Sequence, residues 1–137
     1  MGAGGRDLSA VPRMFLNGTA MAGGSMHHLL DGSELVAATR TAAKYHFYSV
    51  RDEFPGLYPV ADGGAIAGEV YELSYELLRD SLLPGEPAEL ELSVIELEDG
   101  GGALSMRLRS EYLGAPGVHD ITQFGGWREY LRQIRRQ

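Results

Sequence analysis

An alternation of apolar and polar residues with a period of two constrains the fold of this chain most. Residues 90–97 read Leu-Glu-Leu-Ser-Val-Ile-Glu-Leu, and residues 65–73 place Ile66 and Val70 on one face. Successive side chains of a β-strand point to opposite faces, so both segments are predicted to be half-buried strands. The glycine-rich turn at residues 99–102 predicts a hairpin in which residues 103–112 return beside residues 90–97.

The rest of the chain predicts short strands and a few short helices. The predicted strands cover residues 11–16, 35–38 and 44–50, and the predicted helices cover 26–30, 75–82 and an arginine-rich stretch after Gly126. Ser25 and Ser74 stand where helix N-caps are expected. Residues 54–59 contain two prolines and a glycine and are predicted to form a turn-rich loop. This pattern predicts an α+β domain whose strands curl into a small mixed β-barrel with a few short helices.

Length and composition narrow the classes of protein. A chain of 137 residues suffices for one domain, and we expect residues 1–10 to be a disordered lead-in to a single domain over 11–137. No segment has the roughly 20 apolar residues that span a bilayer, and no apolar run near the N-terminus indicates a signal peptide. The absence of cysteine excludes disulfides and thiolate chemistry and favours the cytoplasm. The net charge of −7 argues against a nucleic-acid partner.

Five short motifs follow one another along the first half of the chain. They are Asn17-Gly18-Thr19-Ala20, Ala37-Ala38 with Thr39 or Thr41, Tyr45-His46-Phe47-Tyr48, Phe54-Pro55-Gly56-Leu57 and Ile66-Ala67-Gly68-Glu69-Val70-Tyr71. In this order they resemble the gamma-glutamylcyclotransferase fold family, which includes the AIG2-like proteins. The last third adds residues 94–100, Glu111, Asp120-Ile121-Thr122 and Gly125-Gly126-Trp127-Arg128, and within that fold it is most similar to the C-terminal domain of allophanate hydrolase.

That resemblance implies a domain that handles a small carboxylated amide or carbamate and assists its decarboxylation. In the allophanate hydrolase branch the loop after the first strand carries a histidine as the expected catalytic group, and here that position aligns with Ala20. His27 or its neighbour His28 could take its place, and His27 is the candidate of the two. In the cyclotransferase branch a glutamate acts as general acid and base, and Glu86 lies in the corresponding region. Glu86 and His27 are therefore the candidate catalytic residues.

A loop of small residues is the candidate binding element. Asn17, Gly18, Thr19, Ala20 and Met21 follow a predicted strand, and their backbone N–H groups are expected to form a concavity for an anion. The positive end of a helix starting near Ser25 would add to it. The last residue of the aromatic motif, Tyr48, is a further candidate for substrate contact.

The remaining polar residues have two readings each. Glu69 lies in a strand expected to be buried, where it either lines the pocket or pairs with Arg107 or Arg109. Glu111, Asp120, Trp127 and Arg128 form a tail signature, which either belongs to the site or fixes the tail over the barrel. No spacing of His, Asp and Glu resembles a metal site, and no cofactor is expected.

Three functions are consistent with these features. The first is a stand-alone domain like the C-terminal part of allophanate hydrolase, with cofactor-free acid/base chemistry on a small carboxylate-bearing substrate. The second is a gamma-glutamylcyclotransferase that releases 5-oxoproline. The third is a non-catalytic binding or assembly subunit of a separate amidase. Strand edges and the aromatic tail also offer surface for a homodimer, but the sequence does not decide between monomer and dimer.

Overall fold

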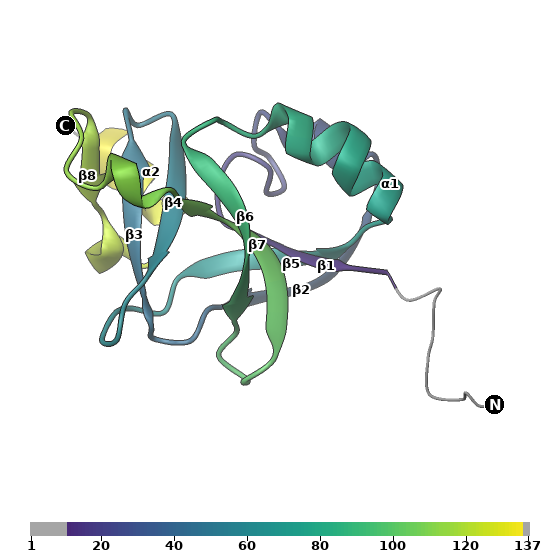
Figure 1. Ribbon diagram of the computed structural model, residues 1–137, viewed down its shortest axis with the longest axis horizontal. Helices are drawn as coiled ribbons and strands as arrows, with labels where there is room; N and C mark the ends of the chain where they lie inside the picture. The colour runs from purple at the N-terminus through teal and green to yellow at the C-terminus, as the bar shows by residue number, and fades with distance from the viewer. Residues whose placement is uncertain (1–10, 136–137) are drawn as a thin grey trace.

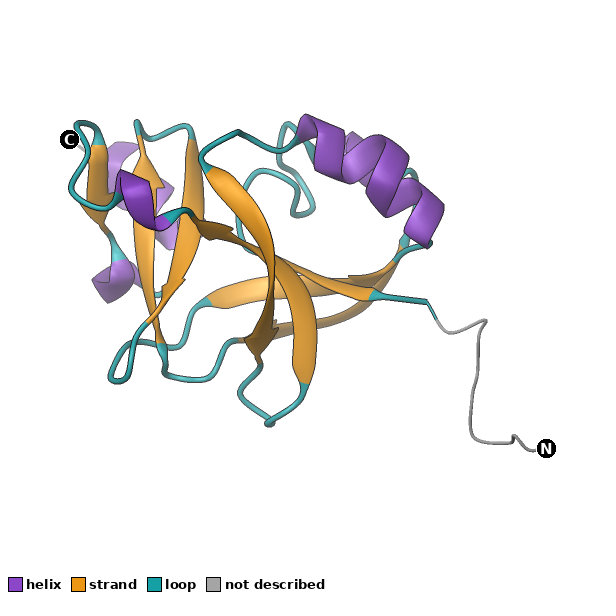
Figure 2. Cartoon of the chain, in the orientation of Figure 1, coloured by secondary structure: helices purple, strands orange, loops and turns teal. Residues whose placement is uncertain are grey.

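The computed structural model describes residues 11–135, so the predicted lead-in at residues 1–10 and the last two residues lie outside the described part. The strands are β1 (Arg13–Leu16), β2 (Glu34–Arg40), β3 (Tyr45–Val50), β4 (Phe54–Pro59), β5 (Ala67–Glu72), β6 (Leu90–Glu96), β7 (Gly102–Leu108) and β8 (Val118–Asp120). Strands are the commonest regular structure in the described chain, and the helical segments lie at two places beside them (Figures 1 and 2).

One mixed sheet contains all of these strands. Its order is β2-β5-β1-β7-β4-β3-β8, and β6 pairs with β7 outside this path. The β1–β7 and β4–β7 pairs are parallel and the others are antiparallel. The sheet curls until the end of β2 meets the end of β6, where Thr41 and Leu97 form a bridge. The result is a half-barrel with short helices, as the alternating sequence pattern predicts.

The strand β4 corrects the prediction of a turn-rich loop at residues 54–59. Its first four residues are buried, and it pairs with β3 along its whole length. On its other side β4 pairs with β7 at one position only, Leu57 opposite Arg107. A proline removes a backbone donor, which costs little where few sheet bonds are made. Pro55 and Pro59 are therefore compatible with a strand in the interior of the sheet.

Two helical segments cover one end of the half-barrel. The 3-10 helix η1 spans His27–Leu30, and a longer segment runs through α1 (Tyr75–Leu77), η2 (Leu78–Leu82) and η3 (Leu83–Gly85). Ser74 caps α1 as predicted, accepting a hydrogen bond from the Leu77 N–H at 3.0 Å. Ser25 does not cap η1, because the chain turns into it at Met26 without a side-chain cap. A helix dipole at Ser25 is therefore not part of the site.

The described part of the chain ends in the arginine-rich helix α2 (Trp127–Arg135), which the sequence predicts. Two short 3-10 turns, η4 (Ser110–Tyr112) and η5 (Thr122–Phe124), lie on either side of β8. Trp127 and Tyr130 are buried and join the main core, together with Phe15, Phe47 and Leu57. Within residues 11–135, no helix has the length and apolar character needed to cross a membrane.

Candidate functional site

The loop that follows β1 carries unsatisfied hydrogen-bond donors. Among the described residues, the backbone N–H groups of Gly18, Thr19 and Ala20 have no acceptor, while the Met21 N–H bonds to the Gly18 carbonyl at 3.1 Å. Gly18 packs so closely against β4 that a Cβ there would come within 2.5 Å of Pro55 Cδ. The side-chain amide of Asn17 also makes no hydrogen bond within residues 11–135, although its polar atoms are not fully buried. Several free backbone N–H groups on one loop can form a concavity for an anion, so this loop is suited to a bound anion.

Glu86 lies opposite this loop, immediately after η3. Its backbone N–H bonds to the Leu83 carbonyl at 3.1 Å, which fixes the turn. Its carboxyl group has neither a hydrogen-bond donor nor a cationic partner in the described part of the chain. Burial without a compensating charge disfavours the ionised form and raises the pKa of Glu86 to about 7. A carboxyl group with such a pKa can both donate and accept a proton near neutral pH.

Two adjoining cavities lie between the loop and Glu86. One of about 40 Å³ is lined by residues 17–20 together with Pro55, Glu86 and Pro87. The other, of about 190 Å³, shares Thr19, Phe54, Glu86 and Pro87 with the first. Both are small beside the roughly 300–1,000 Å³ of pockets for drug-sized ligands. The site therefore suits a molecule of few heavy atoms.

The predicted site residues separate into two groups. Asn17, Gly18, Thr19 and Ala20 line the same cavity as Glu86. Met21 does not, because it faces two larger cavities beside the C-terminal tail.

His27 and Tyr48 also line neither of the two small cavities. The Nδ1–H of His27 donates to the Ala20 carbonyl at 2.9 Å, and its ring lies 5.7 Å from that of Tyr71. Tyr48, on β3, approaches the ring of His46 at 3.4 Å. His27 therefore touches the backbone of the binding loop and not the space beside Glu86.

Glu69 pairs with a residue other than the two predicted. Its carboxylate accepts the Ala22 N–H at 2.9 Å, the Tyr71 hydroxyl at 2.8 Å and Nη2 of Arg128 at 3.2 Å. Arg107 and Arg109 instead form ion pairs with Glu91 on the neighbouring strand β6. The prediction was wrong because β1 separates β5 from β7 in the sheet, which puts those arginines out of reach.

The contacts of Glu69 determine its charge. Burial, the largest influence, acts to raise the pKa of this carboxyl, but the bonds from Ala22, Tyr71 and Arg128 outweigh it and hold the pKa below its usual value. The hydroxyl of Tyr71 shows the converse: burial and the bond to Glu69 raise its pKa to about 12. Glu69 is thus ionised at neutral pH and Tyr71 keeps its proton.

The tail residues do not act as one group. Arg128 donates to the Ala22 carbonyl at 2.7 Å as well as to Glu69, and Trp127 packs into the core. Asp120 accepts the Thr122 N–H at 2.8 Å and the Thr122 hydroxyl, which shapes the turn before α2. Glu111 is exposed in η4. Only Arg128 connects the tail with the binding loop through a hydrogen bond.

A second polar cluster, which the sequence does not reveal, ties α2 to β3. Asp52 accepts hydrogen bonds from Ser49 at 2.7 Å and from Tyr130 at 2.5 Å. These bonds, the largest influences, hold the pKa of Asp52 below its usual value. Asp52 has a positive φ of 58°, a conformation that a non-glycine residue rarely adopts. Its side-chain bonds offset the strain and place α2 beside the sheet.

Within residues 11–135, no three His, Asp or Glu side chains are grouped so as to hold a metal ion. The half-barrel with a donor-rich loop after its first strand instead defines a protein of the AIG2-like fold. A mouse AIG2-like protein shares this fold with a TM-score of 0.53 and 20% identity, over 78% of this chain and 85% of that one. Residues 12–132 match the family model of the allophanate hydrolase C-terminal domain. The chain belongs to this family.

Three relatives illustrate the range of the family. A uropathogenic Escherichia coli-specific protein is 30% identical with a TM-score of 0.82, over 89% of this chain and 96% of that one. Allophanate hydrolase of Kluyveromyces lactis is 26% identical with a TM-score of 0.84, over 91% of this chain and 22% of that one. Urea amidolyase of Saccharomyces cerevisiae is 25% identical over 96% of this chain, which spans only 8% of the yeast protein's length.

Proposed function

We propose that this protein binds a small carboxylated amide or carbamate between the β1 loop and Glu86, and that Glu86 transfers a proton during its decarboxylation. The observation that carries the proposal is a half-buried carboxyl group without partners among the described residues, its pKa raised to about 7, facing a loop of unpaired N–H groups. The names of the relatives, allophanate hydrolase and urea amidolyase, direct attention to carboxylated ureas as substrates.

The chemistry requires a single proton. In a compound R–NH–COO⁻ the bond between nitrogen and the carboxylate carbon breaks, carbon dioxide leaves, and the electron pair remains on nitrogen. Protonated Glu86 donates its proton to that nitrogen, giving R–NH₂ and ionised Glu86, which is reprotonated from water. Backbone N–H groups of Gly18, Thr19 and Ala20 hold the substrate oxygen atoms during this step. No cofactor is needed, and we expect the activity in the cytoplasm.

In this proposal Glu86 takes the place of the histidine that is expected at the position of Ala20. The related branch is expected to use a histidine at this position, and alanine can transfer no proton. Glu86 lines the same cavity as Ala20 and supplies a group that titrates near neutral pH. The small cavities favour a compact carbamate over a gamma-glutamyl compound, which has a longer chain to accommodate.

Binding of malonate, a stable dicarboxylate, tests the site. Ligand at 100 times its dissociation constant should stabilise the wild-type protein by about 2.7 kcal/mol, which raises the melting temperature measurably. Because an anion beside Glu86 binds best while Glu86 is protonated, the affinity should fall roughly tenfold between pH 6 and pH 8. In Glu86→Gln the affinity should not change with pH. Glu76→Gln, which removes an exposed carboxylate on α1, should behave as wild type.

Decarboxylation is tested separately with ¹³C-labelled allophanate, followed by NMR as the carboxylate signal is replaced by that of bicarbonate. Wild type should accelerate this conversion and Glu86→Gln should lose at least about 100-fold of the acceleration, the usual contribution of a general acid. Equal rates in the two proteins would exclude Glu86 as the proton donor. Stabilisation by gamma-glutamyl amides or 5-oxoproline, without malonate binding, would identify a cyclotransferase. No binding of either kind would favour an assembly subunit of an amidase.

A further inference from the structure

Both ends of the binding loop are held by one buried residue, Glu69 of β5. The chain leaves β1 at Leu16, which is paired with Glu69 of β5 in the sheet. Six residues later the loop returns to the same glutamate, whose Oε1 accepts the Ala22 N–H at 2.9 Å. The residues with free N–H groups, Gly18 to Ala20, lie between these two attachments.

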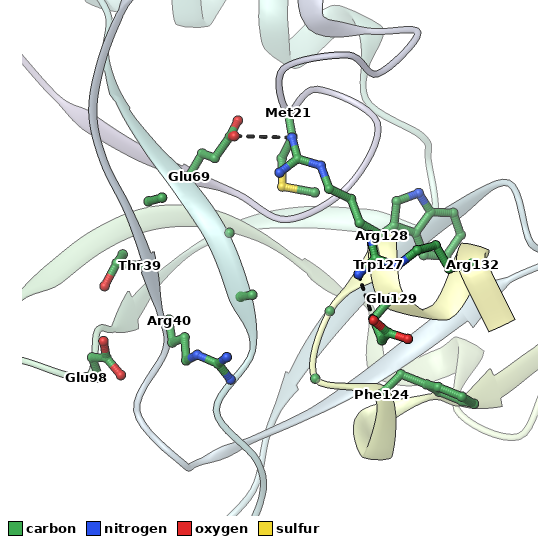
Figure 3. A pocket seen from close by; sticks show the side chains of 15 residues that line it. Met21, Thr39, Arg40, Glu69, Glu98, Phe124, Trp127, Arg128, Glu129 and Arg132 are labelled. Carbon is green, nitrogen blue, oxygen red and sulfur yellow. Dashed lines mark hydrogen bonds and ion pairs between the residues drawn. The ribbon is translucent and has the colours of Figure 1, made fainter.

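The second attachment is made from two sides. Glu69 holds the N–H of Ala22, and Arg128 from α2 holds its carbonyl at 2.7 Å. Arg128 Nη2 also lies 3.2 Å from Oε2 of Glu69, so the two side chains bind each other as well as the loop. Figure 3 shows the contact between Glu69 and Arg128 beside Met21, and all three residues line a cavity of about 550 Å³. Glu69 is 7% exposed, so little water competes for these bonds.

We propose that Glu69 and Arg128 are positioning residues: they hold the loop in the conformation that presents its N–H groups to the ligand, which makes the C-terminal helix a working part of the site. This inference rests on the proposed function for the identity of the ligand, but the geometry of the loop can be tested without any ligand. Neither residue lines the cavities beside Glu86, so their effect on binding is exerted through Ala22.

Amide hydrogen exchange measures the position of the loop directly. In Arg128→Gln, the amides of Met21 and Ala22 should exchange at least tenfold faster than in wild type, because the loop opens without its second attachment. Arg132→Gln is the matched control: it removes the same charge from the same helix, and Arg132 pairs with Glu129 and not with the loop. The Phe47 amide, bonded to Thr122 in the core, reports global opening and should be affected equally in both variants.

Malonate affinity then connects the loop with the site. Arg128→Gln should bind malonate at least tenfold more weakly than Arg132→Gln at a temperature where circular dichroism shows both to be folded. Arg128→Lys, which keeps a charge near Glu69, should recover part of the affinity. Equal loop exchange in the Gln variants would overturn the positioning role whatever the malonate result. Failure of wild type to bind malonate would overturn the proposed ligand class alone, and the exchange data would still decide the role of Arg128.

Discussion

Two glutamates beside the same loop have opposite environments. Glu69 receives three hydrogen bonds, one of them from a cation, and its pKa lies below the usual value. Glu86 receives none from the described residues, and its pKa rises to about 7. Divergent environments of this kind commonly separate a structural carboxylate from one that exchanges protons. Burial alone thus does not raise the pKa of a carboxyl group; burial without hydrogen-bond or cationic partners does.

The largest expected effect on stability comes from replacing Glu69, the glutamate that accepts three hydrogen bonds. Glu69→Ala should lower the free energy of unfolding by about 2–4 kcal/mol, because it leaves the Tyr71 hydroxyl and the Ala22 N–H unpaired in a buried place. Urea denaturation at pH 7 measures the loss. Glu98 is an exposed glutamate that lines the same 550 Å³ cavity as Glu69. Its replacement by alanine should change the free energy of unfolding by less than about 0.5 kcal/mol. Equal losses of stability in the two variants would show that the hydrogen bonds of Glu69 do not stabilise the fold.

Replacement of Glu86, the glutamate without partners among the described residues, should increase the free energy of unfolding above neutral pH. Between pH 4.5 and about 7 folded Glu86 retains a proton that the unfolded chain has released, so the stability of wild type falls across this window and stays lower above it. Gln has no charge to bury. Glu86→Gln should therefore match wild type near pH 4 and exceed it at pH 8, by up to about 3 kcal/mol. Melting curves across this pH range would contradict the raised pKa if the difference between the proteins stayed constant.

A smaller effect tests the hydrogen bond that Tyr71 donates. Tyr71→Phe should cost about 1–2 kcal/mol, since it removes one donor from a buried, ionised carboxylate and leaves the ring in place. The same change at Tyr48, whose hydroxyl makes only a 3.4 Å contact, should cost less than about 0.5 kcal/mol. Chemical denaturation of both variants makes the comparison. A larger loss in Tyr48→Phe would mean that the Glu69 cluster contributes less than its geometry indicates.

Much of the fold can be predicted from local pattern. Alternation at residues 65–73 and 90–97 predicts β5 and β6, and Ser74 predicts the start of α1. The strand β4 is missed because Pro55 and Pro59 resemble loop residues, and only the single-position pairing with β7 makes them acceptable. The strand β8 has three residues, too few to show a period, and it forms by pairing with β3.

The candidate site can be predicted in part, because some of its residues lie in short local motifs. Small residues after β1 indicate free backbone donors, and the family resemblance directs attention to Glu86. The pairing of Glu69 with Arg128 cannot be read from spacing, because 59 residues separate them and only the placement of α2 brings them together. The motif around Glu69 indicates a polar group in a buried strand, but it does not name the partner of that group.

The distance along the chain between the binding loop and Arg128 has a consequence for biosynthesis. Arg128 follows Ala22 by 106 residues. At translation rates of about 5–20 residues per second, the loop emerges roughly 5 to 20 seconds before the helix that completes its attachment. During that interval the Ala22 carbonyl lacks the hydrogen bond from Arg128. A chain whose synthesis stops before residue 128 therefore lacks this second attachment of the loop.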